Sequence, residues 1–194
     1  MKFGNFPDEP IPPLVFNPPK KQKYKLQLDM TQILDSTGRK VTKMLPDGNC
    51  LFRSLSFCLY QTQDRHMEIR STLVEFIFKN GDHYKPLLFE GTLTDHLEMM
   101  RKPGAWGTQV ELQAAADYYK MSIYLLTKRE QQDRYQWYLY RPRNSAVPAD
   151  GLPHIELAHP GSVHFDCIVD ASTLQNPKSI PQLDGGTDNF EGIL

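Results

Sequence analysis

The chain has 194 residues, of which 40% are hydrophobic and 23% charged, a composition typical of one soluble globular domain with tails. Its formal net charge of -1 gives no electrostatic reason to expect nucleic acid or an anionic membrane as a partner. No apolar run approaches the roughly 20 residues of a membrane helix, and the first residues lack the apolar core of a signal peptide, so we expect a cytoplasmic or nuclear protein without a transmembrane segment.

Two terminal segments without hydrophobic periodicity flank a central part of the chain in which apolar residues recur at regular spacing. Residues 1–23 are rich in proline and end in the basic run 20–23, which predicts a flexible tail, with a ligand for a proline-binding partner as the alternative. Residues 171–194 combine proline, glycine and aspartate without periodicity, which predicts a mobile C-terminal tail. The single domain is therefore expected over residues 24–170.

Within this domain, the hydrophobic pattern predicts helices first and strands afterwards. Apolar residues spaced three and four apart predict helices over about 24–38, 50–60, 64–79, 92–101 and 108–119. Thr108 and Glu111 form a capping box at the start of the last helix. Short runs of apolar and aromatic residues predict strands over 121–127, 135–140, 155–158 and 163–169.

The stretch around Cys50 predicts a tight turn that places a cysteine in the first turn of a buried helix. Asp47, Gly48 and Asn49 are turn formers, and glycine can adopt a positive φ without steric cost. A cysteine at a helix N-terminus lies near the positive end of the helix dipole, which favours the thiolate. The backbone N–H groups of the turn can also hold a developing oxyanion. We interpret Cys50 as a candidate nucleophile, with a small buried core residue as the alternative.

His164 and Asp166 form a candidate base and its orienting acid. On a strand over 163–169, side chains alternate between faces, so these two share a face with Cα atoms about 6.5–7 Å apart. The carboxylate can then reach an imidazole nitrogen and orient the ring, which takes the proton of Cys50. An ordinary histidine and aspartate on a polar sheet edge is the alternative.

Trp106 lies on a loop with Gly104 and Gly107 on either side of it, just before the capped helix. A tryptophan at such a position either fills a gap in the core or forms one wall of a substrate cleft. The flanking glycines make the cleft wall a competitive interpretation.

The remaining cysteines and histidines do not indicate a second site. The three cysteines include no CxxC pair, which argues against a disulfide framework and a Cys-rich zinc site and suits a reducing compartment. Cys58 and Cys167 are expected in the core. His154 or His159 could approach His164, but no carboxylate or thiolate spacing supports a metal site. Three other histidines are expected to be solvated: His66, His83 and His96.

Three motifs in this order resemble the ovarian tumour (OTU) family of papain-like cysteine proteases. Residues 47–53 match its Asp-Gly-x-Cys-Leu-Phe-Arg signature, and residues 106–112 match its Trp-Gly segment that leads into a Glu-Leu helix. Residues 164–166 match its strand motif of histidine, an aromatic residue and an acid or amide. The resemblance covers about residues 38–170, with Thr108 at a position where a second glycine is common.

The resemblance implies the papain-like OTU fold, an α/β (α+β) single domain with a small mixed central β-sheet flanked by helices. It implies a deubiquitinase that hydrolyses the isopeptide bond after the C-terminal glycine of ubiquitin in conjugates or polyubiquitin chains, without a cofactor or metal. Cys50 would attack the carbonyl carbon, His164 would protonate the leaving lysine amine and then activate water, and Asp166 would orient His164. We expect a monomer.

The same resemblance assigns roles around the nucleophile. Backbone N–H groups of residues 47–50, including Gly48 and Asn49, would hold the oxyanion, and the Asp47 side chain would brace the loop. Trp106, Gly107 and Phe165 would line the narrow channel for the glycine-rich tail of ubiquitin.

Two alternatives share the fold. One is a cysteine protease that acts on another ubiquitin-like modifier or on a polyprotein, since specificity depends on surfaces around the catalytic residues. The other is a catalytically silent ubiquitin-binding module, which would need a lost cysteine, histidine or orienting acid. A passive domain that serves a proline-rich adaptor tail is a further, non-enzymatic possibility.

Overall fold

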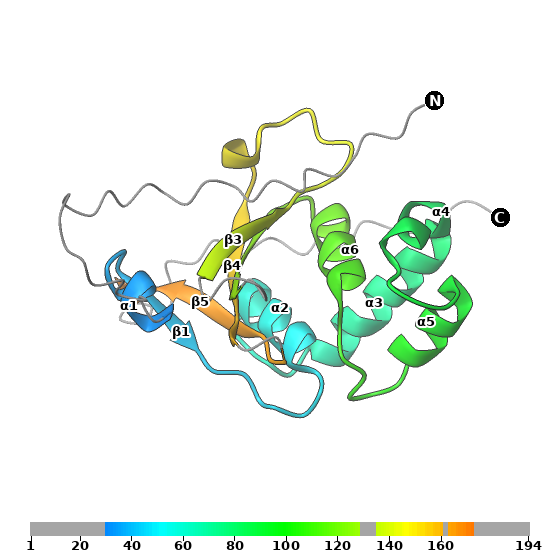
Figure 1. Cartoon of the computed structure of the whole chain (residues 1–194), viewed down its shortest axis with the longest axis horizontal. Coiled ribbons are helices and arrows are strands. Elements are labelled where there is room, and N and C mark those ends of the chain that lie inside the picture. The colour runs from blue at the N-terminus through cyan, green and yellow to red at the C-terminus, as the bar shows by residue number, and fades with distance from the viewer. Residues whose placement is uncertain (1–29, 129–134, 161–162, 173–194) are drawn as a thin grey trace, which may run out of the picture.

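A mixed five-stranded sheet in the order β1-β5-β4-β2-β3 forms the centre of the fold (Figure 1). The computed structural model describes residues 30–128, 135–160 and 163–172, so the two predicted tails fall almost entirely outside the described residues. Strands β2 and β4 run parallel, and the other neighbouring pairs are antiparallel. The strands are β1 (Arg39–Thr42), β2 (Ser122–Lys128), β3 (Tyr135–Tyr140), β4 (His154–His159) and β5 (Asp166–Asp170).

Helices cover both faces of this sheet. The α-helices are α1 (Met30–Asp35), α2 (Cys50–Tyr60), α3 (His66–Lys79), α4 (Gly81–Tyr84), α5 (Leu93–Met100) and α6 (Gln109–Tyr119), and the 3₁₀ helices are η1 (Lys85–Leu87) and η2 (Ala149–Gly151). Helix α2 packs between the sheet and α3, and α5 and α6 pack on α3 (Figure 1). The mixed sheet flanked by helices confirms the predicted fold class.

Alternation along the strands builds two separate cores. Leu125 of β2 and Cys167 of β5 belong to the main core beneath α2, α3 and α6. Their neighbours Leu126 and Ile168 face the opposite side, where they pack with Leu34 of α1. Because successive side chains of a strand point to opposite faces, β2 is apolar on both sides, as its sequence predicted.

The capping box predicted at the start of α6 is present. Thr108 accepts a hydrogen bond from the backbone N–H of Val110, and its own N–H donates to Glu111 Oε2 at 2.7 Å. This reciprocal arrangement satisfies two backbone donors that the first turn of a helix leaves without an intrahelical partner.

The structure differs from the predicted elements at several ends. Strand β1 was not predicted, because four residues at a sheet edge, three half-buried and one exposed, carry little periodic signal. The first described helix begins at Met30, and the last strand begins at Asp166 rather than at residue 163. The segment 81–87 forms two short helices that are too brief to show a helical period.

Cys167 lies in the core and Cys58 packs against it, as expected, but the two form a disulfide, which the argument against a disulfide framework did not predict. The bond joins α2 to β5 between Cα atoms 6.4 Å apart, and the two residues are separated by 109 positions in the sequence. Their pairing depends on how α2 packs on the sheet, which local spacing does not reveal. The odd cysteine count arises because Cys50 is the free thiol.

Among the described residues, no helix is both long enough and apolar enough to cross a membrane.

Removal of the disulfide should lower stability without changing the fold. A covalent link that closes a loop of this length restricts the unfolded chain, and we expect reduction to lower the free energy of unfolding by about 2–4 kcal/mol. Denaturant unfolding of the oxidised and reduced protein measures this difference.

The matched control for this experiment is the double variant Cys58→Ala/Cys167→Ala, whose unfolding midpoint should not respond to reductant. Equal midpoints for the oxidised and reduced wild-type protein would contradict the expectation.

Candidate active site

Cys50 begins helix α2 and is 6% exposed, at the end of the predicted turn. Gly48 has φ +80°, and a Cβ atom at this position would overlap the carbonyl group of Gly104. Asp47 Oδ1 accepts a hydrogen bond from the backbone N–H of Asn49 at 3.0 Å. The turn therefore needs glycine both for its backbone conformation and because another loop packs directly on it.

Asp47 is held by Arg53, one turn into the helix. Arg53 Nη2 donates to Asp47 Oδ2 at 2.6 Å, and Nε donates to both carboxylate oxygens at 3.1–3.2 Å. The Arg53 guanidinium holds the pKa of the Asp47 carboxyl well below its usual range, with help from the hydrogen bonds of Asn49. The pair connects the start of the turn to the helix that follows it, which is the bracing expected of Asp47.

The side chain of Asn49 does not cap helix α2, although it occupies the cap position. Its Oδ1 instead accepts the backbone N–H of Gly104 at 2.9 Å and a guanidinium N–H of Arg70 at 2.8 Å. The backbone N–H groups in the first turn of α2 are consequently not covered by this side chain. Such groups can donate to a negatively charged oxygen at the helix N-terminus.

His164 and Asp166 are in contact, as predicted. The distance between His164 Nε2 and Asp166 Oδ1 is 3.1 Å, and Asp166 is fully buried. His164 precedes strand β5 rather than lying within it, so the contact does not depend on strand alternation. The carboxylate also accepts the backbone N–H of Met44 at 2.9 Å and Lys43 Nζ at 2.8 Å.

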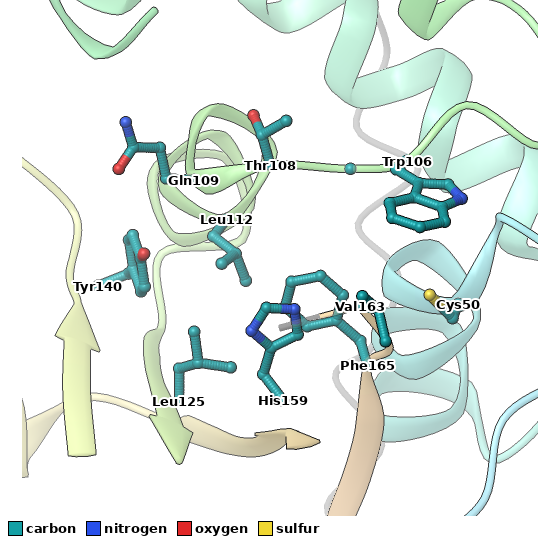
Figure 2. Close-up of a pocket in the computed structure, with 11 residues that line it drawn as sticks. Cys50, Trp106, Thr108, Gln109, Leu112, Leu125, Tyr140, His159, Val163 and Phe165 are labelled. Atoms are coloured by element: carbon teal, nitrogen blue, oxygen red, sulfur yellow. The ribbon is translucent and has the colours of Figure 1, made fainter. Parts of the chain in front are cut away.

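Cys50 and both sequence neighbours of His164, Val163 and Phe165, line a pocket of about 260 Å³. Figure 2 shows the opening between α2, the loop before α6, and the segment that enters β5. Trp106 and Gly107 form one wall of this pocket. Trp106 is 61% exposed, which rules out a core plug. A Cβ atom on Gly107 would press on the Leu51 side chain of α2, so the absence of a side chain lets this wall approach the helix.

His159, at the end of β4, also lines the pocket. Its ring stacks on Phe165 with centroids 4.2 Å apart, and Nδ1 lies 3.3 Å from Thr127 Oγ1. Burial lowers the pKa of His159, and the charge of His164 lowers it further. The sequence indicated only that His154 or His159 could approach His164, and it did not indicate the contact of His159 with Phe165. In the part of the chain that the structure describes, no three His, Cys, Asp or Glu side chains are grouped to hold a metal ion.

Three contributions to the site were not predicted. Lys43 binds Asp166 from the loop before the cysteine turn, where no pattern marks it. Arg70 lies next to Ile69 on the buried face of α3. A charged residue beside the apolar stripe of a predicted helix was the one sequence feature that could have identified it. His96 was expected to be solvated, but it is 8% exposed and its Nε2 lies 2.7 Å from Glu111 Oε1. This contact joins α5 to the first turn of α6, which follows the Trp106 loop.

The model of the OTU-like cysteine proteases matches residues 45–146. These residues include the cysteine turn and the Trp106 loop, and the match ends before His164 and Asp166. The contact between the last two residues is therefore an observation that the family match does not contain.

Curated relatives carry the same domain. The chain is 35% identical over 113 residues to OVARIAN TUMOR DOMAIN-containing deubiquitinating enzyme 10 of Arabidopsis thaliana, covering 57% of this chain and 31% of the relative. It is 30% identical over 164 residues to OTU domain-containing protein 1 of Homo sapiens, covering 79% of this chain and 32% of the relative. The chain thus spans about a third of the length of these relatives.

Solved structures share the fold. The OTU domain of OTUD1 superposes with a TM-score of 0.63 at 28% identity, covering 72% of this chain and 91% of that domain. The OTU protease of Qalyub virus superposes with a TM-score of 0.55 at 26% identity, covering 68% of this chain and 83% of that protein. The family match, the motifs and the superposition agree, and the chain belongs to the OTU-like cysteine protease family.

Proposed function

We propose that this domain is a deubiquitinase that hydrolyses the isopeptide bond after the C-terminal glycine of ubiquitin in conjugates or chains. The observation that carries the proposal is that Cys50 lies at the N-terminus of α2 in one pocket with both neighbours of His164. The relative in Arabidopsis thaliana, named a deubiquitinating enzyme, supports ubiquitin as the modifier.

In the proposed mechanism, Asp166 determines which nitrogen of His164 accepts the proton of Cys50. Because the carboxylate contacts Nε2, it favours the tautomer with a proton on that nitrogen and leaves Nδ1 to accept the proton of Cys50. After the thiolate attacks the carbonyl carbon, His164 returns the proton to the leaving lysine amine, and the acyl-enzyme forms. His164 then removes a proton from the water that hydrolyses the thioester.

The backbone N–H groups of Gly48 and Cys50 would stabilise the tetrahedral oxyanion. The N–H of Asn49, which the sequence also suggested, already donates to Asp47 Oδ1. The Asn49 side chain turns away toward Gly104, which supports this role because it leaves the first turn of α2 uncapped. Fixed donors of this kind need little reorganisation as negative charge develops on the oxygen. The oxyanion would thus be held by backbone groups that the Asp47–Arg53 pair keeps in place.

The walls of the pocket support a narrow, glycine-rich substrate tail. Trp106 and Gly107 line one side and Phe165 another, and the planar rings leave an apolar passage toward Cys50. A tail with two glycines next to the scissile bond fits between such walls, whereas larger side chains would collide with them. We propose these three residues as substrate-binding residues.

We propose that the domain acts as a monomer in the cytoplasm or the nucleus, as the sequence suggested. Thiols are kept reduced in these compartments, so the bond between Cys58 and Cys167 would persist there only under oxidising conditions. Another ubiquitin-like modifier or a polyprotein remains the second candidate substrate, because the catalytic groups would be the same. The silent binding module is disfavoured by the presence of a cysteine, a histidine and an acid at the expected positions.

Ubiquitin with an electrophile at its C-terminus should form one covalent adduct with the wild-type protein and none with Cys50→Ala. The thiol of Cys50 is the only free thiol among the described cysteines, so an adduct on it identifies the nucleophile and the modifier together. Intact-mass measurement gives the result, and Cys50→Ala should still bind ubiquitin.

The double variant Cys58→Ala/Cys167→Ala is the control and should retain the adduct. If the folded wild-type protein reacts only with a probe made from another modifier, that modifier and not ubiquitin is the substrate. A folded protein that reacts with no probe would favour the silent module.

Asp166→Asn should retain activity within about tenfold of the wild type, whereas Asp166→Ala should lose about 100-fold or more, because the general base would lose its orientation. An asparagine oxygen can still accept the hydrogen bonds of Met44 and His164. Its NH₂ group would face Lys43, whose exposed side chain can turn to solvent. Hydrolysis of ubiquitin with a C-terminal fluorophore measures the effect.

Asp170→Asn, an exposed change on the same strand, is the matched control and should have wild-type activity. If Asp166→Ala were as active as this control, Asp166 would have no orienting role.

A further inference from the structure

Arg70 of α3 is a buried cation whose hydrogen bonds go to neutral oxygens. It is 1% exposed, and its Nη atoms donate to the Asn49 side chain and to the backbone carbonyls of Met100 and Ala105 at 2.7–3.1 Å. Burial lowers the pKa of Arg70, with partial compensation from the negative charges of more distant acidic groups. Burying a charge without a directly bonded carboxylate is costly, and an apolar side chain of similar size would fill the space at lower cost.

The acceptors of Arg70 belong to the two segments that flank the pocket. Asn49 immediately precedes Cys50, and Ala105 immediately precedes Trp106. One nitrogen, Nη2, donates to both, at 2.8 Å to Asn49 Oδ1 and at 2.7 Å to the Ala105 carbonyl. The side chain thus connects the residue before the nucleophile with the residue before the exposed tryptophan.

The surrounding contacts leave little freedom for this connection to move. The guanidinium lies over the ring of Phe52, with its central carbon 3.9 Å from the ring centroid. Asn49 Oδ1 also accepts the N–H of Gly104, and the backbone of Gly48 packs directly on that of Gly104. A planar guanidinium can satisfy these directions at once, which a single ammonium group cannot.

We propose that Arg70 is a positioning residue that fixes the distance between the Cys50 turn and the Trp106 loop, and thereby the width of the channel through which the substrate tail reaches the thiol. Its kinetic consequence rests on the proposed function, because it concerns the rate of acyl transfer to Cys50. Arg70 need not contact the substrate, since it acts through Asn49 and Ala105. The effect of Arg70 on the mobility of the two loops, in contrast, does not depend on the identity of the substrate.

The kinetic test compares Arg70→Lys with a control that loses a buried hydrogen bond elsewhere. Tyr84→Phe removes the bond from Tyr84 to Asp117, within a polar cluster that is not part of the pocket. We expect Arg70→Lys to lower kcat for a fluorogenic ubiquitin substrate by about 10- to 100-fold with KM changed less than about threefold, because the reacting groups are misplaced. Tyr84→Phe should lower the melting temperature but keep kcat within about twofold of the wild type.

A residue with only a structural role would give a different result. Its loss would reduce the folded fraction and leave kcat per folded molecule unchanged. If Arg70→Lys matched Tyr84→Phe in kcat per folded molecule, the positioning role would be excluded.

A second measurement needs no substrate. The chain has two tryptophans, so Trp137→Phe leaves Trp106 as the single tryptophan, which can be excited at wavelengths that tyrosine does not absorb. In this background, Arg70→Lys should lower the fluorescence anisotropy of Trp106 and Tyr84→Phe should not, because only the former releases the loop. If Arg70→Lys does not fold, Asn49→Ala removes the acceptor shared by Arg70 and Gly104 and should lower the anisotropy in the same way. Unchanged anisotropy in the folded variant would overturn the proposal.

The two measurements separate the two hypotheses. If the wild-type protein does not cleave ubiquitin but the anisotropy of Trp106 still depends on Arg70, ubiquitin is rejected as the substrate and the positioning role of Arg70 is retained. Cleavage by the wild type with no dependence on Arg70 in either measurement would keep the substrate and reject the positioning role.

Discussion

The site depends on one buried carboxylate, that of Asp166. A fully buried charge must be satisfied by hydrogen bonds or opposite charges, and Asp166 draws these from two distant parts of the chain. His164 lies on its own segment, while Met44 and Lys43 lie on the loop that leads to the cysteine turn. Because one side chain binds both segments, the position of the histidine is coupled to the path of the chain toward Cys50.

The opposite side of the site is held in a different way. Gly48 and Gly104 bring the cysteine turn and the Trp106 loop into backbone contact, and Arg70 connects them from beneath through Asn49. A disulfide joins α2 to β5 at Cys167, directly after Asp166. Cys50 is therefore fixed both to the segment that carries His164 and Asp166 and to the Trp106 loop by contacts that are distant in sequence.

This division explains how much the sequence could predict. Local signals identified the cysteine turn, the capping box at Thr108, and the pair of His164 and Asp166, because each depends on neighbours within a few residues. The histidine and aspartate meet even though the strand begins at Asp166, since the prediction needed only a separation of two residues. Lys43 and the disulfide partner of Cys58 were not predictable in this way. Lys43 reaches Asp166 because β1 pairs with β5, and Cys58 reaches Cys167 because α2 packs on the sheet.

A comparison of the buried Arg70 with the half-buried Arg143 shows why the Arg70 contacts call for a functional explanation. Arg143 donates to the carboxylate of Asp117 and lies over the ring of Tyr84, so its charge is balanced by a directly bonded acid. Arg70 also lies over an aromatic ring, that of Phe52, but amide and carbonyl oxygens take the place of the acid. If stability alone were selected, we would expect the arrangement of Arg143, in which a carboxylate balances the charge of the guanidinium. The second has the advantage that neutral backbone and amide groups position the two loops without a buried carboxylate beside Cys50.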